Sequence, residues 1–378
     1  MAGLYIHIPF CKRRCVYCDF YSNTDMSLKS RYIDALIAEM RSRQDAFRKE
    51  SVETIYVGGG TPSQLDETDF ARLFDAISAL TFSSSWKEVT VEVNPDDLSV
   101  GYIEMLRSFP FNRISMGVQS FDDADLSFLN RRHTARQAIE AVKNCRKAGW
   151  DNISMDLIYG LPGQTLDAWE RNLRMALRLE TPHLSCYHLT YEEGTVLYDR
   201  LQSGQIREVC EEESVAMFSL LMDCLQNAGY EHYEISNFAR PGFRSRHNSS
   251  YWHDKTYIGI GASAHSYDGA FRQWNVADIR EYIRQADSGR FSPERERIDP
   301  DMRYNDTIIT ALRTSEGLDI AQLGCRFGEE RKNYCLLQAQ PFIAAGTLIL
   351  EGEILRLSRT GIFVSDTIMS SLLFVGDD

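Results

Sequence analysis

Short strand-like segments and longer helix-like segments alternate along residues 4–227, and this rhythm constrains the fold more than any other feature of the chain. The strand-like segments are rich in Val and Ile, and each is followed by a segment with apolar residues every three or four positions, as in an amphipathic helix. Strands are predicted at residues 4–8, 54–57, 89–93, 113–118, 153–157 and 183–189, and helices at or within residues 33–40, 70–80, 102–106, 135–147, 166–179 and 212–227. Because parallel strands need a long crossover connection, six such units in series predict a parallel sheet with helices on its outside.

Three of the predicted strands alternate apolar and polar residues. In residues 89–94 the valines face one way, whereas Thr90, Glu92 and Asn94 face the other, and residues 113–119 and 152–157 follow the same pattern. The apolar face must contact the helices, so the polar face lines the inside. A closed eight-stranded barrel fills its interior with branched apolar side chains. The polar interior therefore predicts an α/β fold with a wider, incompletely closed (β/α)6 barrel that holds a polar ligand.

Past residue 230 the rhythm changes, which indicates additional parts attached to the barrel. Residues 240–253 are predicted to form a loop, residues 259–264 a turn of small residues, and residues 295–303 a charged linker containing Pro300. Beyond them lie helical segments and a predicted hairpin over residues 347–357 that turns at Glu351 and Gly352. The sequence predicts three parts: a barrel core over residues 1–235, an extension over residues 236–294, and a small winged-helix-like domain over residues 295–378.

Charge and targeting signals narrow the class of protein. The formal net charge is −13, which disfavours nucleic acid as a partner because a phosphate binder needs a cationic face. The chain begins with no signal-peptide pattern and contains no apolar run long enough to span a bilayer. We therefore expect a cytoplasmic protein without a transmembrane segment. Its nine cysteines are an odd number, and a reducing compartment would keep them as free thiols.

Three of those cysteines, Cys11, Cys15 and Cys18, lie within eight residues directly after the first predicted strand. Thiolates are the usual ligands of iron–sulfur clusters, and the lysine and two arginines between Cys11 and Cys15 favour the thiolate form. Three ligands for a cube of four irons leave one iron open, as in metal sites that keep a vacancy for substrate. The alternatives are a zinc site, for which no fourth ligand lies nearby, and ordinary buried thiols. The other six cysteines lack ligand spacing.

This C-x-x-x-C-x-x-C loop, with Tyr17 before its last cysteine, resembles the signature of the radical S-adenosylmethionine (SAM) superfamily. The resemblance implies a [4Fe–4S] cluster whose open iron chelates SAM, and whose reduction cleaves SAM to a 5′-deoxyadenosyl radical. Further motifs resemble the oxygen-independent coproporphyrinogen III oxidase family over about residues 4–270: Tyr5-Ile-His-Ile-Pro-Phe-Cys11, Gly58-Gly-Gly-Thr61-Pro-Ser, Val91-Glu92-Val-Asn94-Pro, Ser115-Met-Gly-Val-Gln119-Ser-Phe and Asp156-Leu-Ile-Tyr-Gly-Leu-Pro162.

Several residues in these motifs are candidates for binding SAM. Glycines at the end of a strand let backbone N–H groups approach a ligand, although a glycine triplet is more often a turn. Glu92 can accept from an ammonium group or form a salt bridge inside the barrel with Arg113 or Arg131. Gln119 and Asp156 can bind adenosine hydroxyls or pair with other interior groups. The resemblance implies that Tyr5, Gly59 and Glu92 contact the cluster-bound SAM, and that a second SAM site is lined by Tyr17, Gly60, Thr61, Gln119, Arg131, Asp156 and Thr190.

Two departures from the oxidase pattern point to the heme-chaperone branch of this family. The position of the oxidase's fourth cysteine is Phe20 here, and Cys11 follows the start of the chain almost at once. The motif His247-Asn248-Ser-Ser-Tyr251-Trp252 also matches that branch. A neutral imidazole is a common axial ligand of heme iron, and aromatic residues can stack on a porphyrin. His247 is therefore the candidate heme ligand, and its alternative role is a loop histidine that anchors the barrel.

The function implied by this resemblance is that of a heme chaperone, which binds heme and transfers it to acceptor proteins, with membrane-associated respiratory proteins among the candidates. An electron donor for the cluster is a second expected partner. The alternatives are oxidative decarboxylation of coproporphyrinogen III to protoporphyrinogen IX and a radical SAM methyltransferase that uses two SAM molecules. Phe20 and the short N-terminal segment disfavour the oxidase and discriminate less against the methyltransferase. Among the remaining histidines, His265 is expected near the barrel mouth and His133 at the surface.

Overall fold

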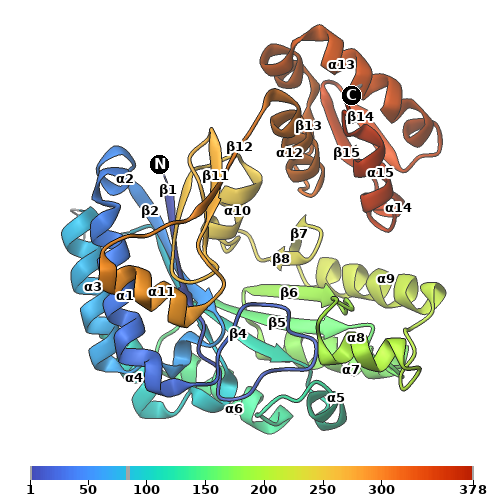
Figure 1. The fold of residues 1–378 in the computed structure, drawn as a ribbon. Coiled ribbons are helices and arrows are strands. Elements are labelled where there is room, and N and C mark those ends of the chain that lie inside the picture. Colours follow the sequence, from blue (N-terminus) through green and yellow to red (C-terminus); the bar gives the residue numbers. More distant parts are fainter. Residues whose placement is uncertain (1, 82–85, 377–378) are drawn as a thin grey trace.

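The structure, a computed structural model, describes residues 2–81 and 86–376, and its first part is the predicted series of β/α units (Figure 1). Strands β1 to β6 pair in parallel, each with the next, and Figure 1 shows the helices outside this sheet. The strands are β1 (Ala2–Ile8), β2 (Val52–Gly59), β3 (Glu88–Val93), β4 (Arg113–Gln119), β5 (Ile153–Tyr159) and β6 (His183–His188). The main helices are α1 (Lys29–Ser42), α3 (Glu67–Thr81), α4 (Val100–Arg107), α6 (Ala135–Lys147), α7 (Leu166–Leu179) and α9 (Glu211–Asn227). The predicted fold class is confirmed.

Helix α7 shows how local sequence builds the outer layer. Thr165 caps its N-terminus by accepting a hydrogen bond from the backbone amide of Ala168. Trp169, Leu173 and Ala176 recur every three or four residues and are completely buried, as expected for the apolar stripe of a surface helix. The Tyr159 ring, on the apolar face of β5, stacks on Trp169 with 5.3 Å between ring centroids. The apolar faces of the strands therefore meet the helices.

The polar faces of the strands are buried inside the barrel, as their alternation predicts. Arg113 is only 2% exposed and donates from Nη1 to Asn152 Oδ1 at 2.9 Å. Ser154 is completely buried, and its hydroxyl lies 2.7 Å from His183 Nδ1. Because buried polar groups are costly unless hydrogen-bonded, this interior holds its side chains in fixed positions.

The chain after α9 extends both edges of the sheet, which the sequence did not indicate. Strands β7 (Glu231–Glu234) and β8 (Asn237–Ala239) join antiparallel at β6. Strand β9 (Tyr257–Ile260) pairs in parallel with β1 and is followed by β10 (His265–Tyr267), β11 (Phe271–Trp274) and β12 (Glu294–Arg297). Helix α11 (Ile279–Ser288) packs on α1. The sheet then has twelve strands among the residues that the structure describes.

Three local predictions in this region are wrong. The predicted loop at residues 240–253 contains helix α10 (Arg246–Trp252), which Ser245 caps by accepting from the amide of Asn248. Gly259 belongs to strand β9 rather than to a turn, and the predicted linker at residues 295–303 contains most of β12 and the start of α12 (Pro300–Leu312). Each of these short elements is stabilised by contacts with distant segments, and such contacts leave little periodicity in the local sequence.

The C-terminal segment forms a second, smaller layer of helices on a three-stranded sheet. The sheet order is β13-β15-β14, and β14 and β15 form the predicted hairpin. Its strands are β13 (Leu318–Asp319), β14 (Leu348–Glu351) and β15 (Ile354–Leu357), and its helices are α12, α13 (Ile320–Ala344), α14 (Arg359–Ile362) and α15 (Ser365–Leu372). Tyr304, Leu323, Leu355 and Ile368 belong to its own apolar core. The expected helix-plus-wing arrangement is thus present, and no helix of the described chain is long and apolar enough to cross a membrane.

Candidate functional site

The three clustered cysteines lie on the loop that follows β1. Cys11 is buried, Cys15 and Cys18 are half-buried, and all three are free thiols. Burial raises the pKa of Cys11, and burial together with the neighbouring thiols raises the pKa of Cys18 to about 11. The thiols are therefore close enough to sense one another's charge. Within the described residues, no three His, Cys, Asp or Glu side chains converge in a geometry ready to hold a metal ion.

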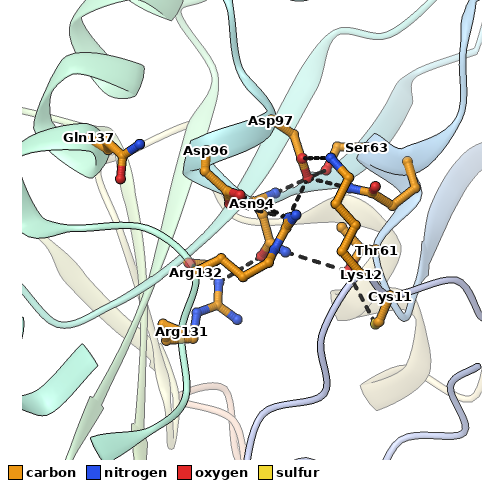
Figure 2. Close-up of polar contacts among 12 residues, drawn as sticks. Cys11, Lys12, Thr61, Ser63, Asn94, Asp96, Asp97, Arg131, Arg132 and Gln137 are labelled. Carbon is orange, nitrogen blue, oxygen red and sulfur yellow. Dashed lines mark hydrogen bonds and ion pairs between the residues drawn. The ribbon is translucent and has the colours of Figure 1, made fainter. Parts of the chain in front are cut away.

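A hydrogen-bonded chain of side chains links Cys11 to Cys15 at the mouth of the barrel, and Figure 2 shows the part from Cys11 through Thr61 and Asn94 to Arg131. Cys11 Sγ lies 3.3 Å from Thr61 Oγ1 at the end of β2, and Asn94 Nδ2 after β3 donates to Thr61 Oγ1 at 3.4 Å. Arg131 Nη2 donates to Asn94 Oδ1 at 2.6 Å, and its Nη1 donates to Cys15 Sγ at 3.3 Å. The connections that follow β2, β3 and β4 thus supply the groups that orient two of the thiols.

The cation that contacts a thiol sulfur comes from outside the cysteine loop. Of the loop's own basic residues, Arg14 donates to the backbone carbonyl of Cys18 and its charge lowers the pKa of that thiol, as the sequence predicts. Lys12 points away and pairs with Asp97 at 3.1 Å, whereas the guanidinium of Arg131 contacts Cys15. Asp97 also accepts from Ser63 Oγ at 2.8 Å and from Arg132 Nη2 at 2.9 Å (Figure 2). The sequence analysis did not identify Asp97 as an anchoring residue. The only indication in the sequence is that Asp97 lies just after the Asn94-Pro motif.

Gly59 and Gly60 must be glycines because neighbouring atoms leave no space for a Cβ at either position. Gly59 has φ +114°, and a Cβ there would lie 2.6 Å from the ring of His7. A Cβ at Gly60 would lie 2.7 Å from the backbone of Pro9, and the Gly60 N–H donates to Ile8 O at 2.8 Å. The triplet therefore holds the end of β2 against the start of the cysteine loop.

Glu92 lies on the polar face of β3 and is bound by neutral donors. Tyr56 donates its hydroxyl to Oε1 at 2.7 Å, and the Gly59 N–H donates to Oε2 at 3.0 Å. Burial, with a smaller contribution from the nearby carboxylate of Asp156, raises the pKa of Glu92 to about 7. The alternative of a salt bridge with Arg113 or Arg131 is not seen. Instead, a carboxylate without a cationic partner faces the barrel interior, which suits a positively charged ligand.

The other predicted SAM residues lie on or after different strands and on the cysteine loop. Asp156 accepts from Ser115 Oγ at 3.4 Å, and burial raises its pKa to about 6. Gln119 ends β4 with φ +68°, at a register shift against β5. Tyr17 is half-buried on the cysteine loop beside Arg131. Thr190 follows β6 and is exposed, without a side-chain hydrogen bond to any described residue.

Tyr5 is on β1, and its hydroxyl lies 2.9 Å from His7 Nδ1. Tyr5 pairs in register with Tyr56 of β2, the residue that binds Glu92. Tyr5, Gly59 and Glu92 thus occupy three adjacent strands. The structure brings these three together, and it joins Thr61 to Arg131 through Asn94.

His247 lies on helix α10 rather than on a loop, and its side chain is completely buried. Its Nδ1 is 2.9 Å from Thr54 Oγ1, and its Nε2 is 2.8 Å from the Tyr251 hydroxyl. Burial lowers the pKa of His247 to about 3, so the ring is neutral. This geometry favours the anchoring role, and heme ligation by His247 stays a prediction that requires the hydrogen bond at the ligating nitrogen to break. His133, predicted at the surface, is buried, and its Nε2 bonds to Val118 O.

Comparison with known proteins places this geometry in a family. Residues 5–176 match the radical SAM superfamily, and residues 298–364 match the HemN C-terminal domain. Heme chaperone HemW of Lactococcus lactis is 38% identical over 85% of this chain and 84% of its own length. HemW of Mycobacterium tuberculosis is 32% identical over 98% of this chain and 94% of its own length. The chain belongs to the HemW family of radical SAM proteins.

The chain is also similar to a mitochondrial protein and to a solved structure whose name gives a different activity. A mitochondrial radical S-adenosyl methionine domain-containing protein 1 of Danio rerio is 30% identical over 98% of this chain and 87% of its own length. The structure of the radical SAM coproporphyrinogen III oxidase HemN from Escherichia coli superimposes with a TM-score of 0.86 at 22% identity, covering 98% of this chain and 90% of HemN. At that identity the likeness to HemN establishes the fold.

Proposed function

We propose that this chain binds heme and transfers it to acceptor proteins, and that it holds a [4Fe–4S] cluster and SAM at the mouth of its barrel. The observation that carries the proposal is similarity to proteins named heme chaperone over nearly the whole chain. Membrane-associated respiratory proteins are the proposed acceptors, an electron donor is the second proposed partner, and the cytoplasm is the proposed compartment.

The residues after β1 fit a cluster held by Cys11, Cys15 and Cys18. They are three free thiols on one loop, and Arg131 and Thr61 already donate to or share hydrogen bonds with two of them. Hydrogen bonds to ligating sulfurs orient the ligands and tune the potential of a cluster. When bound, such a cluster would supply an open iron that can take the amino and carboxylate groups of SAM.

Glu92 is the proposed acceptor for the SAM ammonium group. Tyr56 and Gly59 hold its carboxylate in place, and a charge-assisted hydrogen bond is stronger than a neutral one. Tyr5 and Gly59 on the adjacent strands complete this proposed site. The second proposed SAM site takes the remaining positions named above: Tyr17, Gly60, Thr61, Gln119, Arg131, Asp156 and Thr190.

Coproporphyrinogen III oxidation and SAM-dependent methylation are the competing activities. The oxidase's fourth cysteine position is Phe20, whose side chain is 65% exposed at the end of the cysteine loop. A phenylalanine cannot ligate iron, so this departure from the oxidase pattern supports the chaperone proposal over the oxidase.

Anaerobic reconstitution followed by parallel assays tests the proposal. We expect reconstituted protein to bind about one heme per chain and to leave coproporphyrinogen III unchanged in the presence of SAM and reductant. An unrelated protein without a heme site serves as the comparison for non-specific heme binding. Repeated turnover of coproporphyrinogen to protoporphyrinogen would replace the chaperone assignment by the oxidase, and repeated methyl transfer from SAM would replace it by the methyltransferase.

A further inference from the structure

A large cavity opens between the cysteine loop and the C-terminal layer, outside the groups that orient the thiols. Its volume is about 640 Å³, within the range of pockets that hold small molecules and cofactors. The walls come from β1, the loop after Cys18, α10, β9, the β10–β11 hairpin and α12. Aromatic rings dominate the lining, with Tyr5, Tyr21, Trp252, Tyr257 and Tyr267 among them. Such walls suit a flat aromatic ligand, because rings of this kind stack on one another.

One face of the β10–β11 hairpin presents a histidine and a cation to this cavity. His265 pairs with Trp274, and Tyr267 pairs with Arg272, so all four side chains lie on the same face of the antiparallel pair. The His265 ring stacks on Trp274, with 5.7 Å between ring centroids and 22° between planes. His265 and Arg272 both line the cavity.

His265 is also the histidine with free ring nitrogens. The seven others each engage at least one ring nitrogen in a hydrogen bond: His7, His133, His183, His188, His232, His247 and His253. Neither nitrogen of His265 is hydrogen-bonded to any residue that the structure describes, and its side chain is exposed. Partial burial and the nearby Arg272 lower the pKa of His265, which keeps the ring neutral and able to bind a metal.

Two further features at the rim are otherwise unexplained. Phe20 lines the cavity, yet it is 65% exposed. Its apolar ring is therefore available for contact with a ligand. Lys255 also lines the cavity and makes no ion pair within the described chain. Arg272 pairs with Asp306 of α12, and the lining also contains the carboxylates of Asp19 and Asp254. An apolar ring system that carries carboxylates would cover Phe20 and bring acceptors to Lys255 and Arg272.

We propose that this cavity is the heme site, with His265 as the axial ligand of the iron, Phe20 packed on the macrocycle, and Lys255 and Arg272 near the propionates. This inference rests on the proposed heme-binding function and locates it. It assigns iron ligation to the hairpin rather than to the buried His247, which remains with Thr54 and Tyr251.

Titration with ferric heme, followed by Soret absorbance and resonance Raman spectroscopy, tests the assignment on the full chain. The wild type should show a histidine-ligated spectrum, whereas His265→Ala should lose that spectrum and bind heme about tenfold or more weakly. Added imidazole should restore the histidine-type spectrum in His265→Ala, because it can enter the space left by the ring. His253→Ala is the matched control, since that histidine lies on the surface next to α10 and bonds to Ser249 and Glu316.

Metal-free protoporphyrin distinguishes binding of the porphyrin in the cavity from ligation of the iron by His265. It should bind equally well to the wild type and to His265→Ala, and more weakly to Phe20→Ser, whose exposed position leaves folding unaffected. An unchanged heme spectrum and affinity in His265→Ala would overturn the inference and leave heme binding intact. Failure of the folded wild type to bind heme at all would overturn the proposed function as well.

Discussion

Substitution of Glu92 by glutamine tests two effects of the buried carboxylate: its effect on folding stability and its proposed contribution to SAM binding. The side chain keeps its shape, and both contacts can survive. The glutamine Oε1 can accept from the Gly59 N–H, while its Nε2 donates to the Tyr56 hydroxyl oxygen, since a hydroxyl can both donate and accept. What the variant loses is the negative charge, which the barrel interior holds without a cationic partner.

The size of the effect follows from the raised pKa of Glu92. A carboxyl shifted from 4.5 to about 7 is protonated more readily in the folded than in the unfolded chain. The folded state is therefore favoured below the unfolded pKa, and this stability is lost as the pH rises through about 7. At about 1.4 kcal/mol for each tenfold change in the acid equilibrium, the wild type loses up to about 3 kcal/mol at pH 8 and less than about 1 kcal/mol at pH 5. Glu92→Gln does not lose this folding stability, because glutamine does not ionise.

Thermal unfolding of the cluster-free protein between pH 5 and pH 8.5 measures the difference. We expect Glu92→Gln to unfold at about 5 °C above the wild type at pH 8 and at nearly the same temperature at pH 5. In reconstituted protein, SAM titration followed by the cluster's spectrum should show affinity reduced by about tenfold or more, with cluster content unchanged. A variant that is less stable than the wild type by the same amount at every pH would refute the argument from charge, and unchanged SAM affinity would refute the proposed contact.

Three other predictions test the cysteine loop and the packing around it. Cys11→Ala should abolish the uptake of about four irons and four sulfides on reconstitution, and stoichiometric zinc in anaerobically purified wild type, with no iron uptake, would point to a zinc site. Gly60→Ala should lower stability in denaturant unfolding by about 1–3 kcal/mol because its Cβ would meet the Pro9 backbone, whereas the control Gly101→Ala, with open space around it, should not. Arg313→Met should cost about 3–5 kcal/mol by leaving the buried carboxylate of Glu234 without its cationic partner, although Ser236 and Asn237 still donate hydrogen bonds to it. The added substitution Glu234→Gln should recover most of that loss, and an additive double variant would argue against the pairing.

Much of the candidate site could be predicted from sequence because its signals are local. The spacing of Cys11, Cys15 and Cys18 on one loop is itself the ligand pattern of a cluster. The alternation of apolar and polar residues around Glu92 predicts that its carboxylate lies on the inner face of a strand. The resemblance to a family added roles for residues such as Asp156 that spacing alone left open.

The histidines show where such reasoning stops. His247 and His265 carry the same ring, and the motif around His247 made it the stronger candidate ligand. Whether a ring nitrogen is free depends on which side chains other strands bring to it. Thr54 of β2 and Tyr251 of α10 form hydrogen bonds with the two ring nitrogens of His247. No residue of the described chain forms a hydrogen bond with the ring nitrogens of His265.

By itself, the sequence determined the six β/α units, the polar interior of the barrel and the cysteine loop, because periodicity and spacing are properties of neighbouring residues. Only the tertiary structure decided that β9 pairs with β1, that Arg131 rather than Lys12 contacts a thiol, and that an aromatic cavity opens beside Phe20. These outcomes join residues far apart in the chain. Their energies come from burial and hydrogen bonding between segments that local patterns do not couple.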